Sequence, residues 1–328
     1  MKAVLCVTLD GPDALVIGDV PEPMAGNGEV VIRVEACALN FFDTLITAGK
    51  YQVKPPLPFS PGGEIAGLVD HVGQGVAGFS PGMRVMAYLG HGGLREKIAV
   101  AAERVVALPD AVGFEIGSGI AITYGTAIHG LRERAGVKRG ETVAVLGAAG
   151  GAGLAAVEIA KLMGAQVIAA ASSEEKLAIC RAHGADQTVN TSQVGGPSFK
   201  AALKAASGGR GVDVVYDCVG GDLAEPAVRA LTWQGRYLVI GFASGDIPRI
   251  PLNLLLLKGA SAIGVFWGEA VRRDLAAFRA DMSFVLEAIA AGGLRPHVHK
   301  VLEMGEAREA LAILTRREAA GKVVLSFR

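Results

Sequence analysis

Between about residue 125 and residue 241, the sequence alternates short apolar segments with segments of helical spacing, and this alternation constrains the fold more than any other feature. Apolar strands that alternate with amphipathic helices predict a parallel sheet with helices on both faces. We therefore expect an α/β fold class with a doubly wound domain. The expected strands are 142–147, 166–171, 187–190, 212–220 and 236–241, and the expected helices are 153–164, 174–184, 198–207 and 225–235.

The first turn of this alternation is rich in glycine. The stretch from Val143 to Ala156 reads VAVLGAAGGAGLAA, and Ala148 stands where the G-x-G-x-x-G pattern has its first glycine. A glycine turn of this kind often binds nothing. The strand before it and the helix after it favour a phosphate loop, because the backbone N–H groups at a helix N-terminus bind phosphate. The residues expected to hold a dinucleotide are Ala148, Gly150, Gly151, Ala152 and Gly153.

The end of the second strand indicates which dinucleotide binds. NAD-binding folds carry an acidic residue there, which holds the ribose hydroxyls. This strand ends instead in Ala171, followed by Ser172, Ser173 and then Lys176. Hydroxyl donors and a positive charge suit the 2′-phosphate of NADPH, although either serine could simply N-cap the next helix. The sequence favours NADPH as the cofactor.

The chain outside this domain is β-rich at its start and mixed at its end. Segments 29–39, 64–73 and 83–88 read as strands separated by Gly- and Pro-rich turns, which is typical of a compact antiparallel domain. Near the end we expect one long helix over 272–293, a short strand, a helix over 305–320 and a last strand, GKVVLSF. This last strand and helix could rejoin the first domain and make it discontinuous.

Charge and cysteine usage exclude several classes of function. Lys plus Arg equals Asp plus Glu at 32 each, which argues against nucleic acid or an anionic membrane as the main partner. The sequence has no run of about 18 apolar residues and no signal peptide pattern at its start. The four cysteines are widely spaced and form no C-x-x-C pair, so a reducing cytoplasm is the expected location.

An ordered set of motifs along nearly the whole chain resembles one family, the zinc-independent quinone oxidoreductases (zeta-crystallin-like) of the medium-chain dehydrogenase/reductase superfamily. This resemblance implies a GroES-like β domain (1–122 and 266–328), a Rossmann NADPH-binding domain (123–265) and an active site in the cleft between them. It also implies a homodimer or homotetramer that uses NADPH and no flavin. The motifs are ALNFFDTLITAGKYQ, LPFSPGGEIAGLVDHVGQGV, ITYGTAIHGL, VLGAAGGAGLAAVEIAKLMGAQVIAAASSEEK, GADQTVN, GGRGVDVVYDCVGG, GRYLVIGFASG and GKVVLSF.

The resemblance allows the residues to be tested for zinc. Zinc-dependent members of the superfamily have a cysteine where Asn40 stands and a histidine where Gly63 stands, directly before Glu64. Soft and imidazole ligands at tetrahedral spacing are therefore missing. No zinc or other metal is expected in this protein.

A reaction without a Lewis acid suits an acceptor whose own delocalisation spreads the incoming charge, such as a quinone or an α,β-unsaturated carbonyl. Hydrogen-bond donors would stabilise the developing oxyanion. By resemblance, Asn40 and Tyr51 take this role and Thr123 lies near the nicotinamide, so these three are the expected catalytic residues. Tyr51 could equally be a packing residue of its loop, and Thr123 a packing residue of its helix. Asp43 is expected to organise the loop rather than to act as a base.

Further cofactor contacts are expected beyond the glycine turn. Gly241 and Phe242 follow a strand at the carboxyl edge of the sheet, where the nicotinamide would lie. An aromatic segment follows the last strand and could wall the cleft or form a dimer interface. By resemblance, a lysine in GKVVL approaches the cofactor or its pocket, unless it is a solvated surface residue. These expected residues are Gly241, Phe242, Phe266, Trp267, Gly268 and Lys322.

Three functions are consistent with these residues. The first is an NADPH-dependent reductase, free of zinc and flavin, that transfers hydride to quinones or α,β-unsaturated carbonyls. The second is a 2-enoyl thioester reductase acting on acyl-CoA or carrier substrates, because relatives of that kind use a tyrosine at the Tyr51 position. The third is a non-catalytic, crystallin-like NADPH-binding protein. The expected partner is a small-molecule substrate, with neither nucleic acid nor membrane involved.

Overall fold

The structure is a computed structural model that describes residues 1–327, and the chain forms two compact units. The first unit contains Met1–Ile122, Ala270–Gly292 and the chain from Pro296 onward. The second contains Thr123–Glu269 together with Gly293–Arg295. The expected boundaries differ from these units in two places: residues 266–269 and 293–295 pack with the second unit. The first unit is therefore discontinuous.

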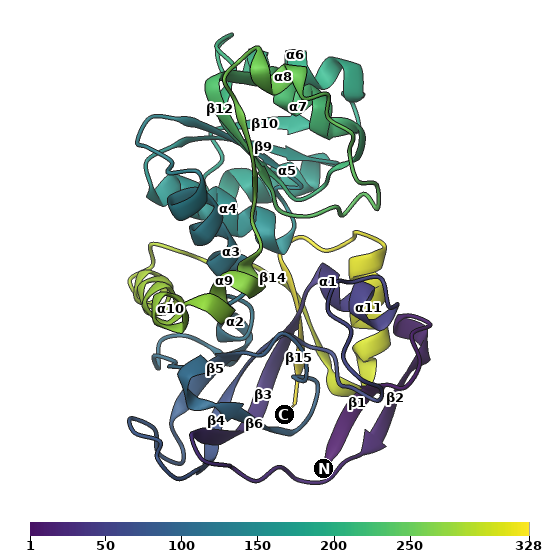
Figure 1. The fold of residues 1–328 in the computed structure, drawn as a ribbon, viewed down its shortest axis with the longest axis vertical. Helices are drawn as coiled ribbons and strands as arrows, with labels where there is room; N and C mark the ends of the chain where they lie inside the picture. Colours follow the sequence, from purple (N-terminus) through teal and green to yellow (C-terminus); the bar gives the residue numbers. More distant parts are fainter. Residues whose placement is uncertain (328) are drawn as a thin grey trace. The chain divides into compact units, whose positions relative to one another are not determined.

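The second unit is built around a six-stranded sheet in which all the strands are parallel (Figure 1). The strand order reverses between β8 and β11, which makes the carboxyl ends of these two strands the topological switch point where α/β sheets bind ligands. In spatial order the strands are β10 (Gln187–Asn190), β9 (Gln166–Ala171), β8 (Thr142–Leu146), β11 (Val212–Asp217), β12 (Leu231–Val239) and β13 (Ser261–Gly264).

Helices connect these strands because each crossover between parallel strands must pass over a face of the sheet. All five residues of β8 are buried, as expected for a central strand with helices on both of its faces. A turn of π-helix (His129–Arg134) extends α3. The helices are α3 (Thr123–Ile128), α4 (Gly151–Leu162), α5 (Glu174–Ala182), α6 (Gly196–Ala206), α7 (Ala224–Ala230), α8 (Asn253–Leu256) and α9 (Trp267–Arg273), the last of which crosses into the first unit.

The first unit is built around a mostly antiparallel seven-stranded sheet with the order β14-β15-β3-β4-β5-β7, in which β6 also pairs with β3. Strands β1 (Lys2–Cys6) and β2 (Leu15–Asp19) form a separate hairpin. The sheet strands are β3 (Glu29–Leu39), β4 (Glu64–Val72), β5 (Arg84–Tyr88), β6 (Lys97–Ala101), β7 (Val105–Ala107), β14 (Val298–Glu303) and β15 (Lys322–Ser326).

The core of the first unit joins the two ends of the chain. Strand β15 lies between β14 and β3, and it pairs with β3 in antiparallel register from Val323 opposite Leu39 to Ser326 opposite Ala36. Figure 1 shows α1 beside α11 in this unit, and the two helices are in contact. The helices of the unit are α1 (Phe41–Thr47), α2 (Phe114–Gly117), α10 (Leu275–Ala290) and α11 (Ala307–Thr315).

Several expected elements are wrong in their extent. The strand expected over 212–220 ends at Asp217, the strand expected over 236–241 begins at Leu231, and the helix expected over 305–320 ends at Thr315. The helix expected over 225–235 ends at Ala230, and Leu231 begins β12, since Thr232 and Trp233 favour an extended chain that can pair beside β11. The long helix expected over 272–293 is two helices. Asp274 separates them, because its side chain accepts a hydrogen bond from Ala277 N (2.9 Å) and so N-caps α10.

Candidate functional site

The glycine turn of the second unit connects β8 to α4 at the switch point of the sheet. Gly147 has a φ of 71°, which favours glycine, and Gly150 is the N-cap of α4. A Cβ added at Gly153 would lie 2.2 Å from the carbonyl oxygen of Gly147, so only glycine lets the helix approach the strand so closely. At Gly150 the nearest atom to an added Cβ is 3.5 Å away. The turn is therefore tight at Gly153 and open at Gly150.

This turn fits the pyrophosphate of a dinucleotide. The N–H groups of Gly151, Ala152 and Gly153 belong to the first turn of α4, where a helix has no carbonyl to accept them. They carry the positive end of the helix dipole, which favours an anion. Ala148 is buried and its N–H donates to Ala170 O (3.0 Å), so its methyl group is part of the packing. Alanine in place of the first glycine leaves the cradle intact.

The tip of β9 carries the residues expected to select NADPH. Ser173 is the N-cap of α5, where its Oγ accepts from Lys176 N at 3.4 Å, so the capping role considered for a serine is present here. Ser172 is exposed, and its carbonyl oxygen accepts from Ser192 Oγ (2.7 Å). The binding of a 2′-phosphate by Ser172, Ser173 and Lys176 stays a prediction.

A buried carboxylate fixes the neighbouring loops at the same edge of the sheet. Asp217, the last residue of β11, accepts from Val219 N (2.7 Å), Gly220 N (2.9 Å) and the hydroxyl of Tyr237. Burial raises the pKa of Asp217 despite these hydrogen bonds. Asp217 was not among the residues expected from the sequence, although an acidic residue at the end of the mostly buried strand VDVVYD was a visible signal.

The loop after β12 lies against the loop that Asp217 holds. Gly241 N donates to Asp217 O (3.2 Å), and a Cβ added at Gly220 would lie 3.0 Å from the ring of Phe242. This contact places Gly241 and Phe242 beside the switch point of the second unit. Contact of either residue with nicotinamide stays a prediction.

The aromatic segment after β13 divides into a buried and an exposed ring. Trp267 is buried and packs on Gly125, where a Cβ would lie 2.3 Å from the indole, and its ring centroid is 5.8 Å from that of His129. The side chain of Phe266 is 52% exposed. Thr123 is buried at the start of α3. Trp267 thus anchors α9 to α3, and cofactor contacts by Phe266, Trp267, Gly268 and Thr123 stay predictions.

The first unit contains a buried polar cluster, defined here as Asn40, Glu64 and Lys322. Asn40 Nδ2 donates to Glu64 Oε1 (2.9 Å). Lys322 Nζ donates to Leu39 O (2.9 Å), Asn40 Oδ1 (2.7 Å) and Glu64 Oε1 (2.8 Å). Because an ammonium has three N–H groups, these acceptors use all of them. Lys322 is therefore not the solvated surface lysine of one interpretation, and its approach to the cofactor or its pocket stays a prediction.

Asp43 has the structural role expected from the sequence. It is fully buried and lies in the first turn of α1, where Oδ2 accepts from Asn40 N (2.8 Å) and Oδ1 accepts from Gly62 N (3.0 Å). It therefore fixes the backbone on which Asn40 stands. Burial raises the pKa of Asp43 to about 7, although the two backbone N–H groups and Lys322 oppose the rise.

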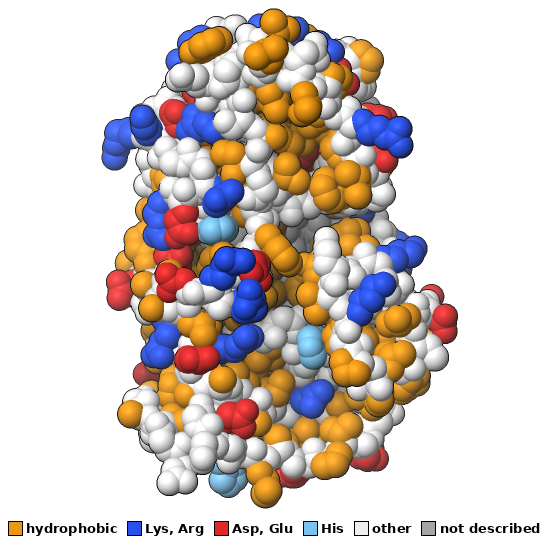
Figure 2. Space-filling model, in the orientation of Figure 1, with side chains coloured by type: hydrophobic (Ala, Val, Ile, Leu, Met, Phe, Trp, Pro, Cys, Tyr) orange, Lys and Arg blue, Asp and Glu red, His pale blue; other side chains and the backbone are white. Residues whose placement is uncertain are grey.

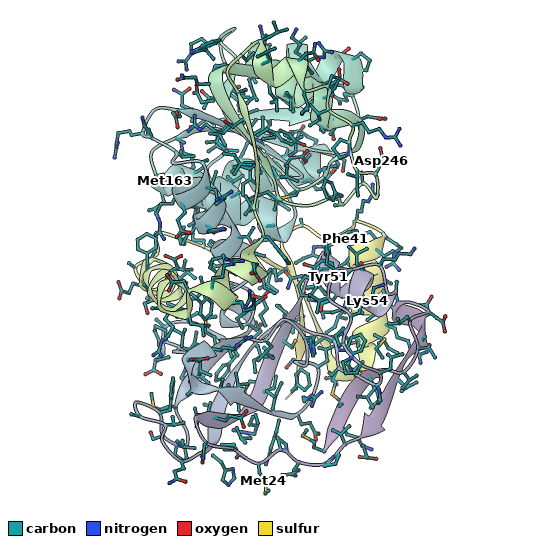
Figure 3. The ribbon with its side chains drawn as sticks, viewed as in Figure 1. Met24, Phe41, Tyr51, Lys54, Met163 and Asp246 are labelled. Atoms are coloured by element: carbon teal, nitrogen blue, oxygen red, sulfur yellow. The ribbon has the colours of Figure 1, made fainter. Side chains whose placement is uncertain are left out.

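Tyr51 lies in the loop after α1, where Figure 3 shows it near Phe41 in the first unit. Its ring packs against Phe42 with centroids 5.4 Å apart, and burial raises its pKa, so the phenol keeps its proton at neutral pH. Tyr88, which was not among the residues expected from the sequence, ends β5 opposite Glu64. Burial raises the pKa of Tyr88 to about 12, so this phenol also keeps its proton at neutral pH.

The position that holds a histidine in zinc-dependent relatives has no room for a side chain here. A Cβ at Gly63 would lie 2.6 Å from the ring of Phe42 and 3.1 Å from Ile122. Within residues 1–327, no group of three or more His, Cys, Asp or Glu side chains is placed to hold a metal ion.

In the same residues, no helix has both the length and the apolar character needed to cross a membrane.

Comparison with known proteins identifies the class to which this fold belongs. Residues 26–110 match the family model described as the alcohol dehydrogenase GroES-like domain, and residues 151–287 match the model described as zinc-binding dehydrogenase. Quinone oxidoreductase-like protein 2 of Bos taurus is 39% identical over all of this chain and 93% of its own length. The quinone oxidoreductase of Sus scrofa is 32% identical over 99% of this chain and 97% of its own length.

Solved structures agree with these relatives. A mycobacterial protein in complex with NADPH superimposes with a TM-score of 0.92, at 30% identity over 99% of this chain and 100% of that one. The CurK enoyl reductase gives a TM-score of 0.88, at 28% identity over 99% and 98%. The fold and the matching models define a medium-chain dehydrogenase/reductase that uses a nicotinamide cofactor. The chain belongs to the zinc-independent quinone oxidoreductase branch of that superfamily, and it is an oxidoreductase of the quinone oxidoreductase type.

Proposed function

We propose that this protein transfers hydride from NADPH to a quinone or an α,β-unsaturated carbonyl, without zinc and without a flavin. The observation that carries the proposal is the setting of Asn40, whose amide is held by Lys322 and Glu64. One N–H of Nδ2 goes to Glu64, and the second has no acceptor among the residues that the structure describes. This uncharged, fixed donor suits an oxyanion whose charge is already delocalised.

The absence of zinc in this proposal has two supports in the first unit. Gly63 leaves no space for an imidazole ligand. The oxygens of Asn40, Glu64 and Leu39 already bind the ammonium of Lys322, and this positive charge would repel a metal cation at the same place. These donors do not fit a zinc site, and no step of the proposed reaction passes through a metal.

The residues act in the proposed reaction by orientation and hydrogen bonding. Gly151, Ala152 and Gly153 hold the pyrophosphate, and a bound nicotinamide supplies the hydride. Asn40 and Tyr51 donate hydrogen bonds to the carbonyl oxygen of the acceptor, which gains negative charge during the transfer. The raised pKa keeps Tyr51 protonated, so its hydroxyl can pass a proton to that oxygen. Thr123 orients the nicotinamide in this proposal.

The selection of NADPH over NADH is supported by Ser172, Ser173 and Lys176 at the tip of β9, where the acidic residue of NAD-binding folds is absent. Replacing Lys176 with alanine should raise the Kd for NADPH about tenfold and leave the Kd for NADH unchanged, because only NADPH carries the 2′-phosphate. Fluorescence titration of both cofactors measures this. The control is Lys161→Ala. Lys161 lies on α4 and its ammonium pairs with Asp186, so this variant should change neither the Kd for NADPH nor the Kd for NADH. Equal losses of NADPH and NADH affinity in Lys176→Ala would refute the assignment.

The second candidate is a 2-enoyl thioester reductase. The likeness to the CurK enoyl reductase and the presence of Tyr51 favour it. An enoyl thioester is also a conjugated carbonyl, so Asn40 and Tyr51 would act on its oxygen in the same way. The difference between the two candidates lies in the acceptor.

Oxidation of NADPH, followed at 340 nm with a panel of quinones, enones and enoyl-CoA esters, tests the proposed function. We expect turnover with small quinones or enones. Turnover with enoyl-CoA esters alone would transfer the function to the second candidate. Binding of NADPH without turnover of any member of the panel would favour the non-catalytic function.

The assembly and the location are further proposals. We propose a homodimer that associates through the β13 edge of the second unit, where the strand pairs with β12 on one side only. Figure 2 shows hydrophobic side chains at the surface in the region of α8. Trp233, Leu256 and Leu257 are 71%, 79% and 71% exposed, and Trp233 lies beside Gly259, close to the end of α8.

The four unpaired cysteines support the cytoplasm as the location of the protein.

A further inference from the structure

Lys322 occupies an unusual position for a lysine. It is the first residue of β15, the strand that lies directly beside β3, and only 5% of its surface is exposed. Gly119 makes room for its stem, because a Cβ at that position would lie 3.2 Å from both Cγ and Cε of Lys322. A buried lysine is costly unless its charge is paired and hydrogen-bonded. The fold provides both for this ammonium.

Lys322 and Glu64 together determine the orientation of the Asn40 side-chain amide. The two ends of an asparagine amide have nearly the same shape, so only hydrogen bonds decide which end is oxygen and which is nitrogen. Lys322 is purely a donor and lies 2.7 Å from one end of the Asn40 amide, and Glu64 accepts at 2.9 Å from the other end. Only one orientation of the amide satisfies both neighbours. Glu64 is itself held by Ile122 N at 2.8 Å.

We infer that Lys322 is a positioning residue for the hydride acceptor, acting through Asn40 and not by binding the cofactor. This inference rests on the proposed role of Asn40 as a donor to the acceptor oxygen. With Lys322 in place, Oδ1 is occupied and the second N–H of Nδ2 keeps a fixed direction toward the acceptor. Without Lys322, Oδ1 loses its donor and the hydrogen bond to Glu64 is the contact left to hold the amide, so the second N–H of Nδ2 no longer keeps a fixed direction toward the acceptor.

The test compares four variants with the unchanged protein: Lys322→Met, Lys322→Met with Glu64→Gln, Asn40→Ala, and Asn40→Ala with Lys322→Met. The second variant removes both buried charges together and so keeps the measurement possible if Lys322→Met alone does not fold. The measurements are the Kd for NADPH, Tm, and kcat with the best acceptor of the panel. Lys97→Met is the matched control in the same unit, since Lys97 forms a partly buried ion pair with Glu22 and Asp70.

A positioning role has a specific signature. We expect kcat to fall at least tenfold in both variants that keep Asn40, with the Kd for NADPH changed less than threefold. Adding Lys322→Met to Asn40→Ala should cause no further loss of kcat, because the residue through which Lys322 acts is already absent. Lys97→Met should match the unchanged protein in kcat and Kd.

Three results would overturn the inference. A tenfold rise in the Kd for NADPH with an unchanged kcat would make Lys322 a cofactor-binding residue. An unchanged kcat in a folded Lys322 variant would remove any role in the reaction, and losses that multiply in the combined variant would show that Lys322 does not act through Asn40. Failure of the proposed function appears elsewhere, as absence of turnover in the unchanged protein, and in that case the inference fails with it.

Discussion

At the scale of single residues, the ring and the hydroxyl of Tyr51 can be separated experimentally. The ring packs on Phe42, whereas the hydroxyl is the part assigned to the acceptor oxygen. Tyr51→Phe should therefore retain the Tm of the protein and lower kcat about 10²-fold, the usual size of a general acid contribution. Steady-state kinetics and a thermal melt measure the two effects. A variant with full activity would show that Tyr51 is only a packing residue.

Asp43 makes a prediction about pH. Its pKa is raised by burial to about 7 in the folded protein, against an ordinary value of 3.8. At a pH between these two pKa values, the carboxyl of Asp43 keeps its proton in the folded chain and loses it in the unfolded chain. The contribution of protonated Asp43 to the stability of the fold is therefore complete below about pH 3.8, and it is lost as the pH rises to about 7. As the pH rises through this range, the free energy of unfolding of the protein should fall relative to that of the Asp43→Asn variant. The size of this fall is on the order of 1.4 kcal/mol for each unit by which the pKa of Asp43 is raised.

Urea denaturation of the protein and of Asp43→Asn at pH 4.5, 6 and 8 measures this difference. The side chain at position 43 of the asparagine variant cannot ionise. The pH dependence of the variant's free energy of unfolding therefore reflects only the other titratable groups of the chain. If the protein instead gains stability relative to the variant between pH 4.5 and 6, Asp43 is ionised in the fold and the direction of its pKa shift is wrong.

Residue types at single positions could be predicted from the sequence, but their partners could not. Asp43 was expected to organise its loop because an acidic residue near a helix start does so locally. The role of Lys322 depends on a contact with Asn40 across 282 positions of sequence, and no local pattern reports such a distance. The acidic residue Asp217 at the end of a strand was visible in the sequence, but its role was not, since two of its three partners are backbone N–H groups of a loop whose path the sequence does not reveal.

At the scale of elements, alanine substitutions at two glycines of the phosphate loop should have different effects. An alanine methyl at Gly150 meets no atom closer than 3.5 Å, so Gly150→Ala should keep its Tm and raise the Kd for NADPH at least tenfold, because the methyl group lies where the pyrophosphate approaches. The same methyl at Gly153 would lie 2.2 Å from Gly147 O. Gly153→Ala should therefore lose about 1–3 kcal/mol of stability from overpacking.

Thermal melts and cofactor titrations of the two variants form a matched comparison. Equal losses of Tm would mean that both glycines serve packing alone. An unchanged Kd in Gly150→Ala would remove Gly150 from the cofactor site.

The elements with the clearest pattern were also the best predicted. Strands 166–171, 187–190 and 29–39 have the expected bounds, because each is followed by residues that cap a helix or form a turn. The errors at 225–235 and 272–293 arose where two elements follow each other without a glycine or proline between them. At Leu231 the pairing with β11 decides where the helix ends, and at Asp274 a single side chain separates two helices.

At the scale of the whole molecule, the exposed apolar side chains Trp233, Leu256 and Leu257 predict how copies associate. Leu256→Glu combined with Leu257→Glu should convert the proposed dimer to a monomer, because both side chains are exposed in the isolated chain and a charge would not tolerate burial. Light scattering after size exclusion measures the mass. Leu162→Glu, a half-exposed leucine on α4, is the control and should leave the mass unchanged. A protein that is already monomeric at micromolar concentration would contradict the proposal.

The two-part organisation was predictable because the change from strand-and-turn to strand-and-helix rhythm is visible along the sequence. The exact assignment of 266–269 and 293–295 was not, since short connecting segments carry no periodicity. The return of the C-terminal strand to the first unit could only be expected as one option. Its place between β14 and β3 comes from long-range pairing.

The position of β15 has a consequence for biosynthesis. The ribosome makes β3 early and β15 nearly 300 residues later, yet the two are neighbours inside one sheet. Thr123–Glu269 is a single stretch that leaves the ribosome with the whole six-stranded sheet in it, so this part of the second unit can fold while synthesis continues. The first unit must wait with an open gap beside β3. The nascent chain therefore acquires its cofactor cradle first, and it acquires the buried lysine that orients Asn40 only when residues 322–326 have been made.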